Sequence, residues 1–183
     1  DNIFFQKYSQ MSRSQQGLAG AGEWETLRKL LPDFKDKRVL DLGCGYGWHC
    51  IYAMEHGASS VVGVDISHKM LEVAKEKTHF PQVEYKCCAI EDVEFPEESF
   101  DVILSSLAFH YVADYEILVK KIYRILKSGG KLVFTVEHPV FTAYGTQDWH
   151  YNEKGEILHF PVDNYYYEGK RTAVFLGEKV TKS

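Results

Sequence analysis

The chain has 183 residues, of which 45% are hydrophobic and 26% are charged, and its formal net charge is −5 at pH 7. These values are ordinary for a globular protein, and the length allows one domain with a sizeable core. The negative charge argues against nucleic acid as the main partner. Because no apolar run is long enough for a membrane span and no signal peptide is visible, we expect no membrane insertion.

The four cysteines, Cys44, Cys50, Cys87 and Cys88, lack the paired C-x-x-C spacing that is typical of zinc sites. We therefore expect no metal site. Cysteines of this kind are typical of reduced thiols, so we expect a cytoplasmic location.

A glycine-rich stretch, Val39–Gly47 (VLDLGCGYG), follows an apolar run and precedes residues with a helix-like pattern. A strand, a glycine turn and a helix in this order hold nucleotide-like ligands in parallel α/β sheets. Gly43 and Gly45 match the dinucleotide pattern G-x-G-x-x-G, but its third position holds the bulky Trp48. Asp41, just before the loop, would repel phosphate, and it suits a cationic ligand end such as an amino group.

The DLGCGYG stretch resembles motif I of class I methyltransferases, and the chain is similar to their type 11 family over about residues 1–140. The resemblance implies S-adenosylmethionine (SAM) as the cofactor and a small molecule as the methyl acceptor. The acceptor atom stays open among oxygen, nitrogen and carbon. The resemblance also implies that Asp41, Gly43, Cys44 and Gly45 contact the cofactor.

The N-terminal segment YSQMSRSQQGL, followed by AGEW, is similar to that of some small-molecule methyltransferases. We expect a short helix or coil and a flexible link here, then a helix over residues 23–31 that Pro32 ends. In that family the segment covers the cofactor and its tyrosine meets the methionine end. The resemblance therefore implies Tyr8 as a lid contact.

Strands and helices are predicted to alternate through the middle of the chain. The expected strands are residues 37–42, 60–64, 83–87, 100–105 and 131–136, and the expected helices are residues 47–56, 67–78 and 114–126. This alternation predicts a Rossmann-like, doubly wound and mainly parallel sheet with flanking helices. Ligands of such sheets bind outside the carboxyl ends of the strands.

Asp65 ends the second predicted strand, 22 residues after Gly43. This is close to the spacing of about 20 residues that is typical of an acid holding ribose hydroxyls. A carboxylate can accept two hydrogen bonds from such a diol. By the resemblance, Ile66 would lie against the adenine, and Met70 on the next helix is a further predicted cofactor contact.

The third and fourth predicted strands end in further candidate contacts. The family's usual aspartate position holds Ala89, which leaves the backbone of Ile90 and the carboxylate of Glu91 to read the adenine amine. The fourth strand end faces the methionine part of SAM in the family. Ser106 and Leu107 are expected to make backbone contacts there.

His110 and Tyr111 are the predicted catalytic residues. Histidine titrates near neutral pH, so we expect His110 to be the base for a hydroxyl or amine acceptor, with His138 second. An acidic carbon or a carboxylate would need no base. Aromatic faces attract the sulfonium, and Tyr8, Phe109 and Tyr111 are candidates for this contact.

The aromatic-rich tail is expected to form a β extension. We divide the domain into a SAM-binding part with its N-terminal lid, residues 1–136, and a hairpin extension, residues 137–183, that covers the site as a substrate lid. The predicted hairpins join residues 149–151 to 157–160 and residues 165–167 to 171–176. The family's final helix and antiparallel strand pair have no counterpart before Ser183, so either the sequence is cut short or the protein departs from the plan.

Two other functions remain open. An NAD(P)-dependent oxidoreductase would use a similar sheet, but Asp41 and Trp48 disfavour it. A SAM-binding protein without catalysis, acting as a sensor or scaffold, is compatible with Ala89 and with the missing C-terminal elements. The sequence pattern identifies neither the acceptor nor the oligomeric state.

Overall fold

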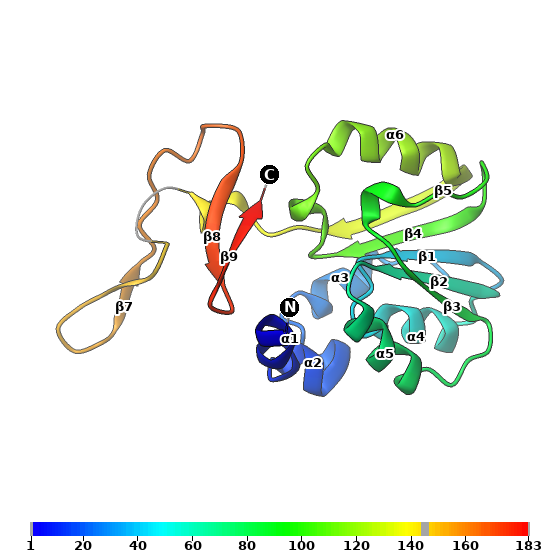
Figure 1. Cartoon of the computed structure of the whole chain (residues 1–183), viewed down its shortest axis with the longest axis horizontal. Coiled ribbons are helices and arrows are strands. Elements are labelled where there is room, and N and C mark those ends of the chain that lie inside the picture. The colour runs from blue at the N-terminus through cyan, green and yellow to red at the C-terminus, as the bar shows by residue number, and fades with distance from the viewer. Residues whose placement is uncertain (1, 144–146, 183) are drawn as a thin grey trace.

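A parallel five-stranded sheet forms the centre of the protein (Figure 1). The computed structural model describes residues 2–143 and 147–182. The strand order is β3-β2-β1-β4-β5, and all neighbouring strands are parallel. The strands are β1 (Arg38–Leu42), β2 (Ser60–Asp65), β3 (Val83–Cys87), β4 (Phe100–Ser106) and β5 (Leu126–Thr135). The order reverses between β1 and β4, which is where such sheets bind ligands.

Helices cover both faces of the sheet, as the Rossmann-like prediction requires. The helices are α1 (Asn2–Ser9), α2 (Ser12–Gln16), α3 (Trp24–Leu30), α4 (Trp48–Glu55), α5 (His68–Lys77) and α6 (Tyr115–Ile125). Figure 1 shows α6 on one face and α4 and α5 on the other. Side chains cap two of these helices: Ser67 Oγ accepts a hydrogen bond from Met70 N, and Asp114 Oδ1 accepts one from Ile117 N.

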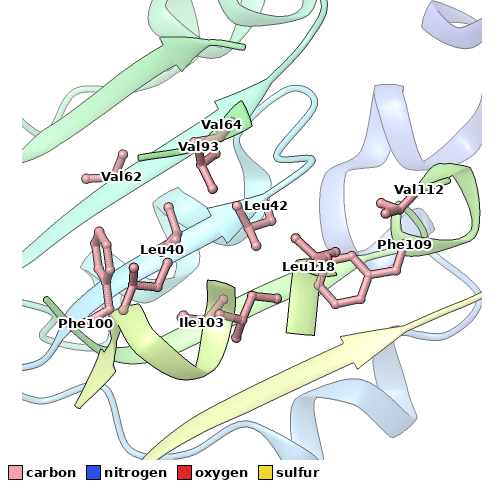
Figure 2. Close-up of a cluster of buried hydrophobic side chains, with 12 residues drawn as sticks. Leu40, Leu42, Val62, Val64, Val93, Phe100, Ile103, Phe109, Val112 and Leu118 are labelled. Atoms are coloured by element: carbon pink, nitrogen blue, oxygen red, sulfur yellow. The ribbon is translucent and has the colours of Figure 1, made fainter. Parts of the chain in front are cut away.

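Two buried apolar clusters hold these layers together. On the α6 face, Leu40, Leu42 and Ile103 belong to the same cluster as Leu118 of α6 (Figure 2). On the opposite face, the alternate strand residues pack with Cys50 and Ala53 of α4 and Leu71 of α5. Because helices cover both faces, the central strands are apolar at nearly every position.

The fifth strand begins earlier than predicted. The chain passes from α6 into β5 at Leu126, so Ser128, Gly129 and Gly130 lie within the strand. The register between β4 and β5 shifts there, and Gly129 has a φ of 77°. A glycine accepts this left-handed backbone without steric cost, so the strand can bulge instead of starting afresh.

Two antiparallel hairpins follow the sheet. β6 (His150–Tyr151) pairs with β7 (Ile157–His159), as predicted. The second predicted hairpin is wrong: β8 (Arg171–Phe175) pairs with β9 (Glu178–Lys182), and residues 165–167 form no strand. Leu176 and Gly177 make the turn with φ values of 53° and 80°, which is the twist that two-residue hairpins favour.

Four short 3-10 helices complete the described chain: η1 (Gly17–Gly20), η2 (Ile90–Asp92), η3 (Phe109–Tyr111) and η4 (Pro139–Thr142). After β5, the described residues add no α-helix and no further strand to the central sheet. Within residues 2–143 and 147–182, no helix has the length and apolar character to cross a membrane. The same residues contain no group of three or more His, Cys, Asp or Glu side chains arranged to hold a metal ion.

Candidate functional site

A cavity of about 880 Å³ opens at the carboxyl ends of the central strands. This volume lies in the upper range for small-molecule and cofactor pockets. The cavity also reaches α1 and β8, which lie on the same side of the sheet in Figure 1. Most of the predicted site residues line it, namely Tyr8, Gly43, Gly45, Asp65, Ile66, Met70, Ile90, Glu91, Ser106, Leu107, His110 and Tyr111.

The glycine loop forms the floor of this cavity. The backbone N–H groups of Gly43 and Cys44 both donate to Val64 O, at 2.8 and 2.9 Å, which fixes the loop against the end of β2. Gly43 has a φ of 80°, and a Cβ there would lie 2.5 Å from the Cβ of Ala108. Glycine is therefore required at this position by the backbone angle and by the close approach of β4's end.

Asp65 is held in one orientation at the edge of the loop. Its Oδ2 accepts a hydrogen bond from Gly45 N at 2.9 Å, and its Oδ1 accepts one from Ser67 N at 2.8 Å. Burial raises the pKa of Asp65, and these two N–H donors act against that shift. Each carboxylate oxygen keeps a further lone pair, so the group fits a vicinal diol such as that of ribose.

An apolar wall stands beside this carboxylate. Ile66 is 73% exposed although it is a large aliphatic residue, and Met70 and Ile90 line the same cavity. Ile66 is therefore a surface of the cavity and not a core residue. Such a wall suits the flat face of a purine, while the exposed Glu91 nearby offers a carboxylate.

Asp41 and Cys44, both predicted to contact the cofactor, do not line the cavity. Asp41 is 1% exposed and accepts a hydrogen bond from Cys50 Sγ of α4 at 3.4 Å. Its Oδ1 has no partner among the described residues, and burial raises its pKa to about 7. The geometry is thus against direct contact, because β1 turns this side chain toward α4 and away from the cavity.

The N-terminal segment closes one side of the cavity. The Tyr8 ring meets the Tyr46 ring edge-on at 5.5 Å, directly above the glycine loop. Arg13 pairs with both carboxylate oxygens of Glu23, at 2.5 and 2.7 Å, and Ser106 Oγ donates to Glu23 Oε1 at 3.2 Å. These contacts tie the N-terminal segment to the end of β4.

Arg13 is a site residue that the sequence reasoning missed. Among the described residues lining this cavity, it is the one Lys or Arg side chain. A guanidinium there can bind the carboxylate of an amino-acid ligand. Its position five residues after Tyr8, in the segment that resembles the family, was the available signal, but spacing alone does not show which way a side chain turns.

His110 and Tyr111 lie in η3, which follows β4, and both line the cavity. His110 Nδ1 accepts a hydrogen bond from Glu137 N at 3.3 Å. Burial, followed by the Lys182 charge, lowers the pKa of His110, which favours the neutral ring. Burial raises the pKa of Tyr111 to about 12. Phe109 is only 3% exposed and packs in the core, behind the cavity.

A second cavity, of about 370 Å³, meets the first at His110 and Glu137. Its other walls come from the C-terminal extension and include Tyr165, Arg171 and Lys182. The two cavities therefore share a wall, which is formed by residues that follow β4 and β5. This is where the reactive end of a ligand seated along the glycine loop would meet a second molecule.

Known proteins are similar to the chain across this region. The family model described as a methyltransferase domain matches residues 40–134. A candidate SAM-dependent methyltransferase from Listeria monocytogenes superposes with a TM-score of 0.81 at 56% identity, covering 88% of this chain and 76% of that one. The SAM-dependent methyltransferase from Mesorhizobium loti gives 0.81 at 40% identity, covering 91% and 75%.

A curated relative is the ubiquinone biosynthesis O-methyltransferase of Coxiella burnetii. It is 36% identical over 112 residues, which make up 60% of this chain and 47% of that protein. The chain thus spans about half the length of this relative.

Proposed function

The chain belongs to the methyltransferase-domain family and is a class I, SAM-dependent methyltransferase; from this premise we propose that it methylates a small-molecule acceptor. When bound, SAM supplies an electrophilic methyl group on a sulfonium. The acceptor's lone pair forms the new bond, and the electron pair of the S–CH₃ bond stays with sulfur.

The observation that carries the cofactor assignment is the fixed Asp65 carboxylate beside the glycine loop. In this assignment Asp65 binds the ribose hydroxyls, and Ile66, Met70 and Ile90 enclose the adenine, with Glu91 at its amine. Because Gly43 and Gly45 have no side chains, the ligand can lie close to the backbone of the loop. Asp41 and Cys44 stabilise the loop without contacting the ligand.

In the same assignment, Arg13 binds the methionine carboxylate and Tyr8 covers the glycine loop. Ser106 and Leu107 form the wall beside the sulfonium. Leu107 has a φ of 54°, which is uncommon for a leucine, and its N–H donates to Thr135 O at 2.9 Å. A strained backbone of this kind is often found at ligand sites, which favours a role for this residue.

The second cavity supports a small acceptor. Its volume of about 370 Å³ suits a metabolite better than a folded chain. The name of the Coxiella relative also refers to methylation of a small molecule. We propose that residues 137–183 act as the lid over this acceptor. The four free cysteines further support a cytoplasmic location.

Calorimetric titration with SAM tests the cofactor site. Asp65→Ala should weaken SAM binding by about tenfold or more, because two hydrogen bonds to a charged group are lost. Asp92→Ala is the matched control, since Asp92 is exposed and does not line the cavity. Equal affinity in the two variants would contradict the ribose assignment.

Incubation with methyl-labelled SAM and a pool of metabolites tests the reaction. We expect label in a compound of low molecular mass, and none when the protein is left out. Tight SAM binding with no label transferred to any pool would favour a sensor or scaffold over an enzyme.

A further inference from the structure

We propose that His110 contacts the methyl acceptor as a hydrogen-bond donor through Nε2, and that it is not the general base. This inference rests on the proposed function, because it assigns an acceptor to the junction of the two cavities. It replaces the role that the sequence suggested for the same residue.

The argument begins with the hydrogen bond to the other ring nitrogen. Glu137 N is a backbone amide, which can only donate, and it lies 3.3 Å from His110 Nδ1. A neutral imidazole has one N–H and one bare nitrogen. With Nδ1 accepting, the ring proton must be on Nε2, so the nitrogen left for a ligand is a donor.

The surroundings of the ring hold this arrangement. Glu137 Oε1 is paired with Lys182 Nζ at 2.6 Å, and Lys182 is only 6% exposed. The Tyr111 ring lies 4.3 Å from the His110 ring, centroid to centroid. A ring flip would place a C–H group against the Glu137 N–H and lose the hydrogen bond.

The second candidate base has the same constraint. His138 Nδ1 accepts a hydrogen bond from Val140 N at 3.3 Å. Of the two described histidines that line the larger cavity, neither therefore has a bare Nε2 that could accept a proton. A hydroxyl acceptor would release its proton to water, which balances the positive charge lost when the sulfonium becomes a thioether.

This chemistry restricts the acceptor. The atom that meets His110 must offer a lone pair, so it is an oxygen of a hydroxyl, carbonyl or carboxylate group, or an unprotonated nitrogen. An ammonium group is excluded from that position because two donors would face each other. Among the described residues, only His110 and Glu137 line both cavities, so this contact lies where the acceptor and the cofactor meet.

Nitrogen-15 NMR of the histidine rings tests the tautomer without any acceptor. Protein labelled in its histidine rings is saturated with S-adenosylhomocysteine, and the His110 signals are assigned by their loss in His110→Gln. We expect a protonated Nε2 and a bare Nδ1 at pH 7. A proton on Nδ1, or a doubly protonated ring, would overturn the proposal.

Variants of Glu137 give a matched pair for the same measurement. Glu137→Ala keeps the backbone N–H and should keep the tautomer, whereas Glu137→Pro removes the donor and should give a mixture of tautomers. If the proline variant does not fold, the wild-type spectrum still decides.

Label transfer from SAM then tests the role in turnover. Gln places an amide N–H near the position of Nε2, so His110→Gln should keep activity within about tenfold, while His110→Asn and His110→Ala should lose about 100-fold or more. A general base would make all three lose about 10²–10⁴-fold. If wild type transfers no label, the proposed function is contradicted. The NMR experiment still tests the His110 tautomer, because it needs no methyl transfer.

Discussion

Glu137 and Lys182 form an ion pair that joins the segment after β5 to strand β9. Oε1 and Nζ are 2.6 Å apart, and the lysine is almost fully buried. The ammonium also lies 5.7 Å from the centre of the Tyr111 ring and 5.5 Å from that of Phe175. One contact thus connects the β8–β9 hairpin to the wall shared by both cavities.

Lys182→Met should loosen this hairpin. The change leaves the Glu137 carboxylate, whose side chain is 27% exposed, without its cationic partner. Because water still reaches Glu137, we expect a loss of about 1–3 kcal/mol, less than for a fully buried pair. Amide exchange of β8 and β9 should then be at least about tenfold faster. Lys179→Met, on the exposed face of β9, is the control, and equal exchange in both variants would contradict the prediction.

Arg13→Met should weaken the binding of SAM. A charged hydrogen bond to the methionine carboxylate is worth about 1.5–3 kcal/mol, so the dissociation constant should rise about 10–150-fold. Arg28→Met serves as the control, since Arg28 pairs with Glu25 on the surface. Calorimetry with both variants gives the comparison. An unchanged affinity in the Arg13 variant would contradict the assignment of Arg13 to the methionine carboxylate.

Gly47→Ala should destabilise the loop through two separate effects. The residue has a φ of 75°, and a Cβ would overlap the hydroxyl of Tyr85 on β3. We expect a loss of about 2–4 kcal/mol in urea unfolding, from backbone strain and from the overlap together.

Two variants separate these effects. Gly155 has a φ of 77° but open space around it, so Gly155→Ala should cost only the strain, about 1 kcal/mol. Tyr85→Phe loses the 2.7 Å hydrogen bond to Thr78 Oγ1 in either background. In a double-mutant cycle it should therefore show a favourable coupling of about 1 kcal/mol with Gly47→Ala and none with Gly155→Ala. Equal coupling in both backgrounds would argue against the overlap.

Much of the fold and about half of the cavity lining could be predicted from the sequence. The alternation of apolar runs and helix patterns predicts the parallel sheet, and the cofactor residues follow because they end successive strands. Asp65, Ile90 and Ser106 line one cavity for this reason. Such residues can be placed in the site once the strand and its carboxyl end have been identified.

The features that the sequence analysis missed or misplaced depend on backbone angles and side-chain directions, and most of these cannot be read from residue spacing. The Leu176-Gly177 turn uses a leucine at positive φ, which no turn pattern predicts. Arg13 depends on how a lid segment folds back over the sheet. For Asp41 a signal existed: it lies between Leu40 and Leu42, which pack on the α6 face, so its side chain had to face α4.

Asp41 also predicts how stability changes with pH. Burial raises its pKa in the folded protein to about 7, whereas an unfolded aspartate titrates near 3.9. Between these values the folded state binds more protons than the unfolded state, so the free energy of unfolding falls as pH rises. The contribution is complete below pH of about 4 and lost above about 7, with a total of roughly 4 kcal/mol.

Asp41→Asn should remove this dependence, because the amide carries no titrating proton. The difference in unfolding free energy between the variant and wild type should therefore shift in favour of the variant from pH 4 to pH 8. The raised pKa of Asp65 is present in both proteins, so it cancels. Asp92→Asn, at an exposed site, should show no such shift. Urea unfolding at the two pH values measures it, and parallel pH profiles for wild type and Asp41→Asn would mean that the buried carboxylate is ionised at neutral pH.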